Sequence, residues 1–267
     1  MHALRLALHM LLLGGLLGAL SARAGGPGGS VPGLRYESGL RAGGHQVGHL
    51  RRGDRNLHGS HYLFGASAIP LDQGQGIYKN TLLSVNAVNY GLTRHFSVGG
   101  GVELISIITG RESGPVYFAN AKLAADVSEV FHVGVNAFYI NYPFPANLED
   151  PQFTERRPGF SVVTGAVTLG DPDIQLTLSG GISRDFDADK TRPAASVAGM
   201  WRLFPRMALI TENWLFFDDP DDYSAICFGV RFIGSTVAVD VALVNNKQIR
   251  EEVLPVGLPI FSVSVAF

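Results

Sequence analysis

The chain has 267 residues, of which 16% are charged, and its formal net charge is −2. So small a net charge gives no reason to expect a nucleic-acid partner. The single cysteine, Cys227, excludes an internal disulfide framework. After the first 24 residues no apolar run is long enough for a membrane-spanning helix, so any membrane span has to be built from strands.

Residues 1–24 have the three parts of a secretory signal peptide. Arg5 lies in a short basic region, an apolar run follows at residues 6–20, and Ala-Arg-Ala occupies residues 22–24. The apolar run is rich in glycine and shorter than the roughly 20 residues that a spanning helix needs. We expect export, with cleavage after Ala24.

Residues 25–60 differ in composition from the remainder of the chain. They are rich in Gly, Arg and His and show no sustained alternation of apolar and polar residues. This composition predicts a flexible periplasmic arm. The histidines in and beside it do not have the spacing of a standard metal site, so we expect no metal. These histidines are His45, His49, His58 and His61.

From residue 61 to residue 267 the chain alternates between strand patterns and turns. The clearest alternation is at 174–182, where Ile174, Leu176 and Leu178 face away from Gln175. About twelve strands are predicted, an even number that suits a single-chain bacterial barrel. They lie near residues 61–67, 78–90, 96–108, 116–127, 131–139, 160–169, 174–182, 194–201, 207–216, 226–232, 237–243 and 261–267.

The connections between these strands alternate in length. Short periplasmic turns and longer external loops are typical of outer-membrane barrels. Short connections are expected near 92–95, 128–130, 170–173, 202–205 and 233–235, and longer ones near 69–76, 143–158, 185–191, 218–222 and 245–256. Aromatic residues near the short turns predict a lower aromatic girdle. They are Tyr90, Phe96, Phe131, Trp201, Phe204, Phe232 and Phe267.

The two strand faces differ in what they carry. One face is Val, Leu, Ile, Ala and Phe with almost no charge, as contact with lipid requires. The other holds a few mid-strand charges among Asn, Ser, Thr and Gly, fewer than a solvated outer surface has. The polar face is therefore expected to enclose a lumen. Its candidate lining residues are Glu103, Lys122, Glu212, Arg231 and Asp240.

These lumen charges are expected to be paired. A hairpin that turned near Glu112 would bring Glu103 opposite Lys122, and an ion pair would satisfy charges that are costly to bury. The remaining three lie on neighbouring strands and could form a second cluster. In both cases a structural bridge that helps to fill the lumen is favoured over a constriction that selects solutes.

The last strand has one apolar face and one small, polar face. The apolar positions are Phe261, Val263, Val265 and Phe267. Alternation that ends in a C-terminal Phe resembles the terminal signal of bacterial outer-membrane β-barrel proteins. The resemblance implies an all-β, transmembrane, antiparallel up-and-down barrel whose last strand pairs with its first. It also implies recognition of that strand by the barrel-assembly machinery, and a location among outer-membrane lipid and lipopolysaccharide.

Three functions are compatible with such a barrel. A passive pore or small-solute transporter is favoured over a structural or surface-interaction barrel with a closed lumen. A lipid-modifying enzyme is disfavoured because no Gly-x-Ser-x-Gly elbow is present and the external loops lack histidine. No catalytic residue and no cofactor are therefore expected.

Overall fold

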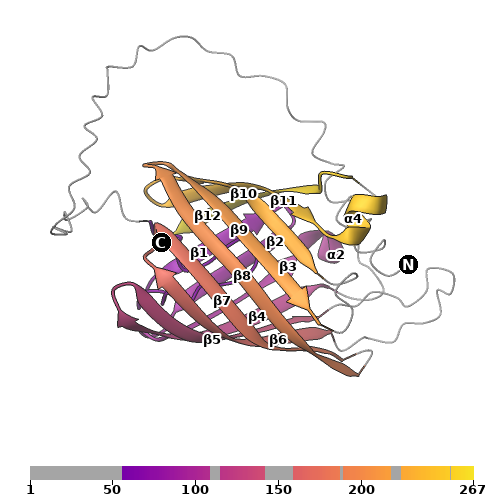
Figure 1. Ribbon diagram of the computed structural model, residues 1–267, viewed down its shortest axis with the longest axis horizontal. Helices are drawn as coiled ribbons and strands as arrows, with labels where there is room; N and C mark the ends of the chain where they lie inside the picture. Colours follow the sequence, from indigo (N-terminus) through magenta and orange to yellow (C-terminus); the bar gives the residue numbers. More distant parts are fainter. Residues whose placement is uncertain (1–55, 109–114, 142–158, 187–188, 218–223, 253) are drawn as a thin grey trace, which may run out of the picture.

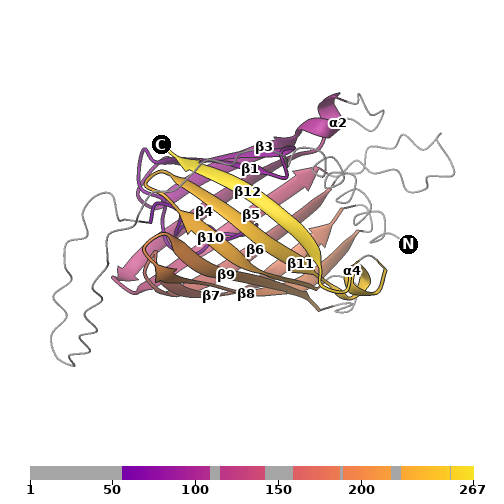
Figure 2. The same cartoon turned by 90° about the horizontal axis from the view of Figure 1, so that it is seen from above.

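The computed structural model describes residues 56–108, 115–141, 159–186, 189–217, 224–252 and 254–267. These residues form a closed barrel in which each strand pairs antiparallel with the strand before it, and β1 pairs with β12 (Figures 1 and 2). Closure leaves no unpaired strand edge. The predicted fold class, an antiparallel up-and-down barrel, is confirmed.

The twelve strands of the barrel vary greatly in length. They are β1 (Gly76–Thr81), β2 (Val85–Gly91), β3 (Phe96–Glu103), β4 (Tyr117–Ser128), β5 (Phe131–Asn141), β6 (Phe160–Gly170), β7 (Ile174–Asp185), β8 (Lys190–Phe204), β9 (Met207–Phe216), β10 (Ala225–Ile233), β11 (Val237–Asn245) and β12 (Leu258–Ala266). Two short helices, α2 (Leu104–Ile108) and α4 (Lys247–Glu252), lie in connections. No helix of the described residues is long and apolar enough to cross a membrane.

The predicted strand count is correct because two errors cancel. The segment 61–67 is not a strand of the barrel and makes only one bridge, between His61 and Ala66. The segment 78–90, predicted as one strand, is the hairpin of β1 and β2, which turns at Leu82 and Leu83 with φ angles of 53° and 62°. Alternation continues across this tight turn, so the pattern alone did not show the break.

The two ends of the barrel have different connections. Short turns join β2 to β3, β4 to β5, β6 to β7, β8 to β9 and β10 to β11, all at the end where the C-terminus lies, which we call the short-turn end (Figure 1). Helices α2 and α4 lie at the opposite, long-loop end. The expected external loop at 69–76 is wrong, because the Gly76 amide donates to the Phe267 carbonyl (2.7 Å) at the short-turn end. The expected loops 143–158 and 218–222 lie outside the described residues.

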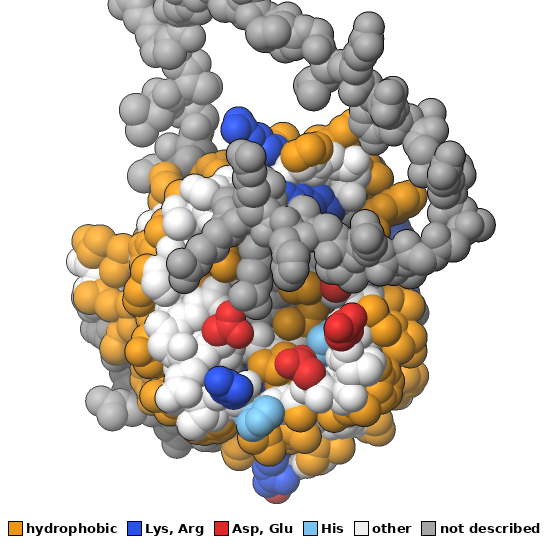
Figure 3. All heavy atoms as spheres, turned by 90° about the vertical axis from the view of Figure 1, so that its left-hand side faces the viewer, with side chains coloured by type: hydrophobic (Ala, Val, Ile, Leu, Met, Phe, Trp, Pro, Cys, Tyr) orange, Lys and Arg blue, Asp and Glu red, His pale blue; other side chains and the backbone are white. Residues whose placement is uncertain are grey.

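Apolar side chains cover the outside of the barrel. Leu178, Phe228 and Val241 are 51%, 48% and 48% exposed although they are mid-strand residues. Seen from the short-turn end, hydrophobic side chains form the outer margin and charged ones lie nearer the middle (Figure 3). Such an exterior is stable against acyl chains, so the barrel is of the transmembrane kind. The predicted girdle aromatics face outward near the short-turn end, and Phe204 and Phe267 are the most exposed of them.

The last strand closes the barrel as predicted. Tyr78 and Asn80 of β1 pair with Val265 and Val263 of β12. Phe261, Val263 and Val265 of β12 and the following Phe267 alternate with buried Ser262, Ser264 and Ala266, so these apolar side chains point outward.

The N-terminal boundary of the barrel domain differs from the expected one. Residues 1–55, with the predicted signal peptide and most of the predicted arm, lie outside the described residues. Residues 56–60, which were expected to belong to the arm, lie inside the barrel, where His58 is fully buried. The arm boundary at residue 60 is therefore wrong, since Asn56 and His58 already make contacts inside the barrel.

Candidate functional site

A segment of the chain before β1 fills the short-turn half of the lumen. We call residues 56–71 the plug. It turns back on itself at residues 62–65, where the Tyr62 amide donates to the Gly65 carbonyl (2.9 Å). Tyr62, Leu63 and Ala68 are 5% exposed or less. The plug enters and leaves at the short-turn end, so its turn is its deepest point in the barrel.

Arg231 of β10 is the most deeply buried contact of the plug. Its Nη1 donates to the carbonyls of His58 (2.9 Å) and His61 (3.0 Å), and its Nη2 donates to that of Tyr62 (3.2 Å). The same guanidinium binds the Asp240 carboxylate at 2.7 and 3.0 Å. Both side chains are 1% exposed or less. A fully buried cation is therefore neutralised by the wall and hydrogen-bonded to the plug.

Lys79 of β1 is a second cation that binds the plug. Its Nζ donates to the carbonyls of Tyr62 (3.1 Å) and Leu63 (2.7 Å) and lies 3.6 Å from the Asp240 carboxylate. Lys79 was not identified from the sequence because it shares a face with Val85 and Ala87, a composition that favours contact with lipid. Lys79 pairs with Ala87 across the β1–β2 hairpin, and this face points inward.

Lys122 of β4 binds only plug carbonyls. Its Nζ donates to Ile69 (2.8 Å), Ser60 (3.2 Å) and Ser67 (3.4 Å), which belong to both arms of the plug. One ammonium group thus ties the two arms together. Lys122 was expected to line the lumen, and the structure places its side chain inside the barrel against the plug.

The predicted Glu103–Lys122 ion pair is wrong. Lys122 pairs across the sheet with Ser97, several rows from Glu103. Glu103 lies at the long-loop end, where its carboxylate accepts the Ile105 and Ser106 amides (both 2.7 Å) at the start of α2. Helix α2 follows β3 directly and ends that strand at Glu103. The register of the β3–β4 pair therefore differs from the register that a turn near Glu112 would give.

Glu212 of β9 binds the tip of the plug. Its carboxylate accepts the backbone amides of Phe64 (2.8 Å) and Gly65 (2.7 Å), and the indole N–H of Trp214 (2.6 Å). The predicted second cluster is therefore correct in part. Arg231 and Asp240 pair directly, whereas the bonds of Glu212 go to the plug and to Trp214.

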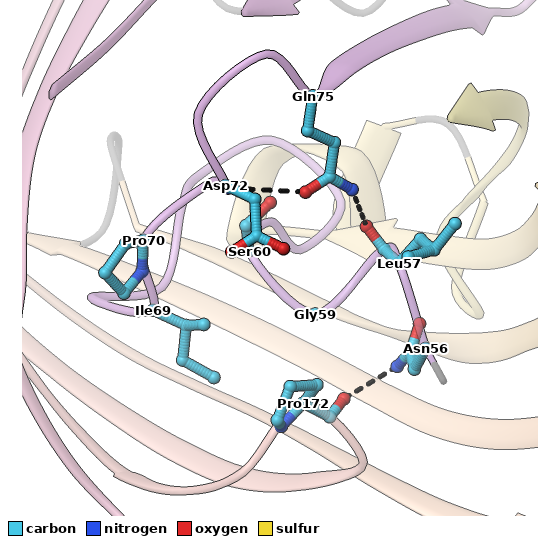
Figure 4. Close-up of a pocket in the computed structure, with 9 residues that line it drawn as sticks. All are labelled: Asn56, Leu57, Gly59, Ser60, Ile69, Pro70, Asp72, Gln75 and Pro172. Carbon is cyan, nitrogen blue, oxygen red and sulfur yellow. Dashed lines mark hydrogen bonds between the residues drawn. The ribbon is translucent and has the colours of Figure 1, made fainter. Parts of the chain in front are cut away.

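Uncharged side chains complete the attachment of the plug. The Thr168 hydroxyl accepts the Ala68 amide (2.8 Å), and the Gln175 amide donates to the Gly59 carbonyl (2.8 Å). Near the opening, Asn56 donates to the Pro172 carbonyl (2.6 Å), beside a cavity of about 20 Å³ (Figure 4). A cavity of that size holds about one water molecule.

The two plug histidines are held in the neutral form. Burial, and next the Arg231 guanidinium, lower the pKa of His58 from 6.5 to about 4. The same two causes lower the pKa of His61 well below its usual value. His58 Nε2 lies 3.2 Å from the Thr236 carbonyl. Since neither ring carries a proton charge at neutral pH, the plug adds no cation beside Arg231.

The long-loop half of the lumen is lined by aromatic rings instead. Trp214 and Phe216 of β9 lie nearly parallel, with centroids 6.2 Å apart, and Phe160 of β6 meets Phe216 edge-on at 6.1 Å. Phe118 of β4 and Phe138 of β5 lie 5.9 Å apart on the adjoining wall. All five are inward and partly exposed. These five residues carry no signal in the sequence that marks them as a group.

Comparisons with known proteins show likeness in fold only. No family model and no curated protein matches the chain. Among solved structures it is similar to a KdgM porin (7% identity, 72% of this chain, 96% of that chain, TM-score 0.45). It is also similar to a NanC porin (6% identity, 72% of this chain, 97% of that chain, TM-score 0.42). A third similar structure is the translocator domain of the autotransporter NalP from Neisseria meningitidis (9% identity, 72% of this chain, 85% of that chain, TM-score 0.32). At these values the likenesses carry no argument on function. The chain's own architecture, a closed antiparallel barrel with an apolar exterior, is that of a bacterial outer-membrane β-barrel.

Proposed function

We propose that this protein passes small solutes across the bacterial outer membrane, and that its plug has to leave the short-turn half of the lumen for passage. The observation that carries the proposal is the way the plug is held. Lys79, Lys122, Glu212 and Arg231 bind it through its backbone carbonyl and amide groups.

Buried charges are a costly way to hold a permanent filler. Replacing a buried ion pair by apolar residues of similar volume is often neutral or stabilising, so a filler that never moves needs no charges. Charges on the wall make sense if that wall is wetted when the plug leaves, because water then solvates them. The open lumen would have three cationic groups and two carboxylates around it, those of Lys79, Lys122, Arg231, Glu212 and Asp240.

Conductance in planar bilayers tests this function. Deletion of residues 56–71 is expected to give steady ion current, because the charged wall residues that hold the plug would then be wetted. The intact barrel is expected to pass less current. Circular dichroism checks that the deletion variant folds. If the folded variant gives no current at high protein loading, the proposed pore is contradicted.

A cross-linked plug provides the opposite change. The Ala68 amide already bonds to the Thr168 side chain, so cysteines at both positions are expected to form a disulfide. In a Cys227→Ser background, oxidation of A68C/T168C is expected to suppress the openings of the intact barrel, and reduction to restore them. The single variant T168C serves as the matched control, and it should not respond to oxidation.

The outer-membrane location leads to a second expectation. The outward face of β12, which ends at Phe267, is proposed as the surface read by the barrel-assembly machinery, with lipid and lipopolysaccharide around the finished barrel. Phe267→Ser is expected to lower the yield of folded barrel in cells and to leave refolding from urea into detergent nearly unchanged. Equal yields in cells would count against this assignment.

The alternative function is a closed barrel that acts through its surface. It is favoured by apolar packing in the lumen, where Ile249 of α4 belongs to one buried cluster with Val244, Leu258 and Ile260. A silent deletion variant would support it. An enzymatic function is not supported by His132, because Nδ1 contacts Asp126 and Nε2 contacts the Gly170 carbonyl, which leaves no ring nitrogen for a base.

A further inference from the structure

The aromatic residues of the long-loop half form a continuous row that ends at the plug. Phe160 is the first residue of β6 and Phe216 the last of β9, so both lie at the long-loop rim. Trp214 is two residues deeper on β9, and its indole bonds to the carboxylate that holds the plug tip. We call Phe160, Phe216 and Trp214 the aromatic ladder.

The plug tip presents another ring at the lower end of the ladder. Phe64 is 53% exposed although its backbone amide is bonded to Glu212 inside the barrel. The next residue, Gly65, lies against Trp214, since a Cβ built on it would be 3.1 Å from the indole ring. A large apolar side chain exposed at this depth requires accessible space above the plug.

The polar groups beside the ladder do not compete for this space. Thr164 of β6, and Ser196 and Arg192 of β8, face inward, and they are 3%, 6% and 8% exposed. Glu103, also at the long-loop end, is committed to the amides of α2. The accessible surface is therefore that of partly exposed rings, with no bare charge from these side chains.

We propose that the aromatic ladder is a binding site for small, uncharged molecules that contain an aromatic ring. Successive rings offer flat apolar faces on which such a ligand stacks in offset or edge-to-face geometry. A sugar fits less well, because its hydroxyls would lose water beside hydroxyl groups that are themselves buried. A ligand stacked on Trp214 lies next to Glu212 and the plug tip, so the site would act in the proposed passage of solutes. That role rests on the proposed function, whereas ligand binding itself does not.

Fluorescence of Trp214 tests the site directly. Trp201, the other tryptophan, points outward, so Trp201→Phe leaves Trp214 as the reporter. The probe is 4-nitrobenzyl alcohol, an uncharged aromatic quencher, added to the barrel in lipid nanodiscs. Saturable quenching is expected, whereas quenching that rises linearly with the probe, as from collisions, would overturn the proposal.

Two variants separate stacking from general apolar binding. Phe216→Leu and Phe160→Leu keep an apolar side chain but remove a ring, and each is expected to weaken binding about tenfold. The matched control is Phe228→Leu on the outward face, which should leave the affinity unchanged. Equal affinities in all three variants would overturn the assignment, as would displacement of the probe by methyl β-glucoside at lower concentrations than by benzyl alcohol.

The plug variants distinguish this site from the proposed pore. With the oxidised A68C/T168C cross-link the ladder is still open above the plug, so binding is expected to persist while current stops. Saturable binding without current in the variant that lacks residues 56–71 would contradict the pore and support the site. Ion current without saturable binding of the probe would contradict the binding site and support the pore.

Discussion

The two halves of the lumen differ in what satisfies their inward side chains. In the short-turn half, Glu212, Arg231 and Asp240 are 1% exposed or less, and each is bonded to the plug or to another wall residue. In the long-loop half, the inward rings of Phe160 and Trp214 are partly exposed. A polar interior is thus not the same as an open interior. The buried charges lie where the plug covers them, and the apolar rings lie where the lumen is accessible.

The largest expected effect is at the carboxylate shared by two cations. Asp240→Ala leaves Arg231 and Lys79 buried without their common partner, which is expected to cost about 3–5 kcal/mol of the free energy of unfolding. The measurement is urea unfolding of the barrel in detergent. Val239→Ala, on the outward face of the same strand, is the control and should cost about 1 kcal/mol. Similar losses in both variants would contradict the contrast between the two faces.

Lys122→Met removes the group that ties the two plug arms together. Three carbonyls lose a charged donor, so the plug is expected to lose about 2–3 kcal/mol of its binding free energy. Limited proteolysis within residues 56–71 should then be faster, while the strands stay protected. Lys190→Met, at the exposed end of β8, is the control. Unchanged cleavage would show that packing alone holds the plug.

A glycine in β3 tests the long-loop half. The ring of Phe118 lies over Gly101, where an added Cβ would be 2.3 Å from the ring. Gly101→Val is expected to cost about 1–3 kcal/mol through overpacking. Gly180→Val in β7 is the matched control, since no atom lies within 4 Å of its Cβ position. This result would confirm that the absence of a side chain at Gly101 makes room for the ring of Phe118.

The smallest expected effect is on the pH dependence of the plug. His58 has a pKa of about 4 when inserted, so the inserted state binds fewer protons than a displaced one with a pKa near 6.5. Insertion is therefore at full strength above pH 6.5 and weakens as the pH falls toward 4, by about 1.4 kcal/mol at pH 5.5. The charged and titratable groups around His58 are Arg231, Asp240, Lys79 and His61.

Proteolysis of the plug at pH 7.5 and pH 5.5 measures this effect. Faster cleavage at pH 5.5 is expected in the intact protein. His58→Gln should lose about half of the difference, because glutamine does not titrate whereas His61, whose pKa is also lowered by burial, still does. A difference of the same size in that variant would assign the effect to the other groups.

The architecture was predictable because alternation is a local property. Most strands record which of their faces meets lipid, and β7 shows this over most of its length. The hairpin of β1 and β2 was missed because alternation continues across its turn. The register of β3 and β4 was wrong because α2 replaces a simple turn.

The plug was not predictable because its partners have no sequence signature. Lys122 binds carbonyl groups, which every residue has, at positions more than 50 residues away in the chain. Strand alternation was enough to place four charged side chains on the inward face, those of Lys122, Glu212, Arg231 and Asp240. It did not show that residues 56–71 cover them. The aromatic ladder was missed for a related reason. Phe160 and Phe216 lie on different strands and meet only when the barrel closes.

The attachment of the plug to β1 affects how it can return to its place. Only residues 72–75 separate the plug from Gly76, and four residues span at most ~14 Å. A released plug therefore stays near the opening at an effective concentration in the millimolar range, as for other short tethers. Reinsertion is then a first-order process whose rate does not depend on how much protein is present. A separate peptide with the same sequence would have to be supplied at millimolar levels to take its place.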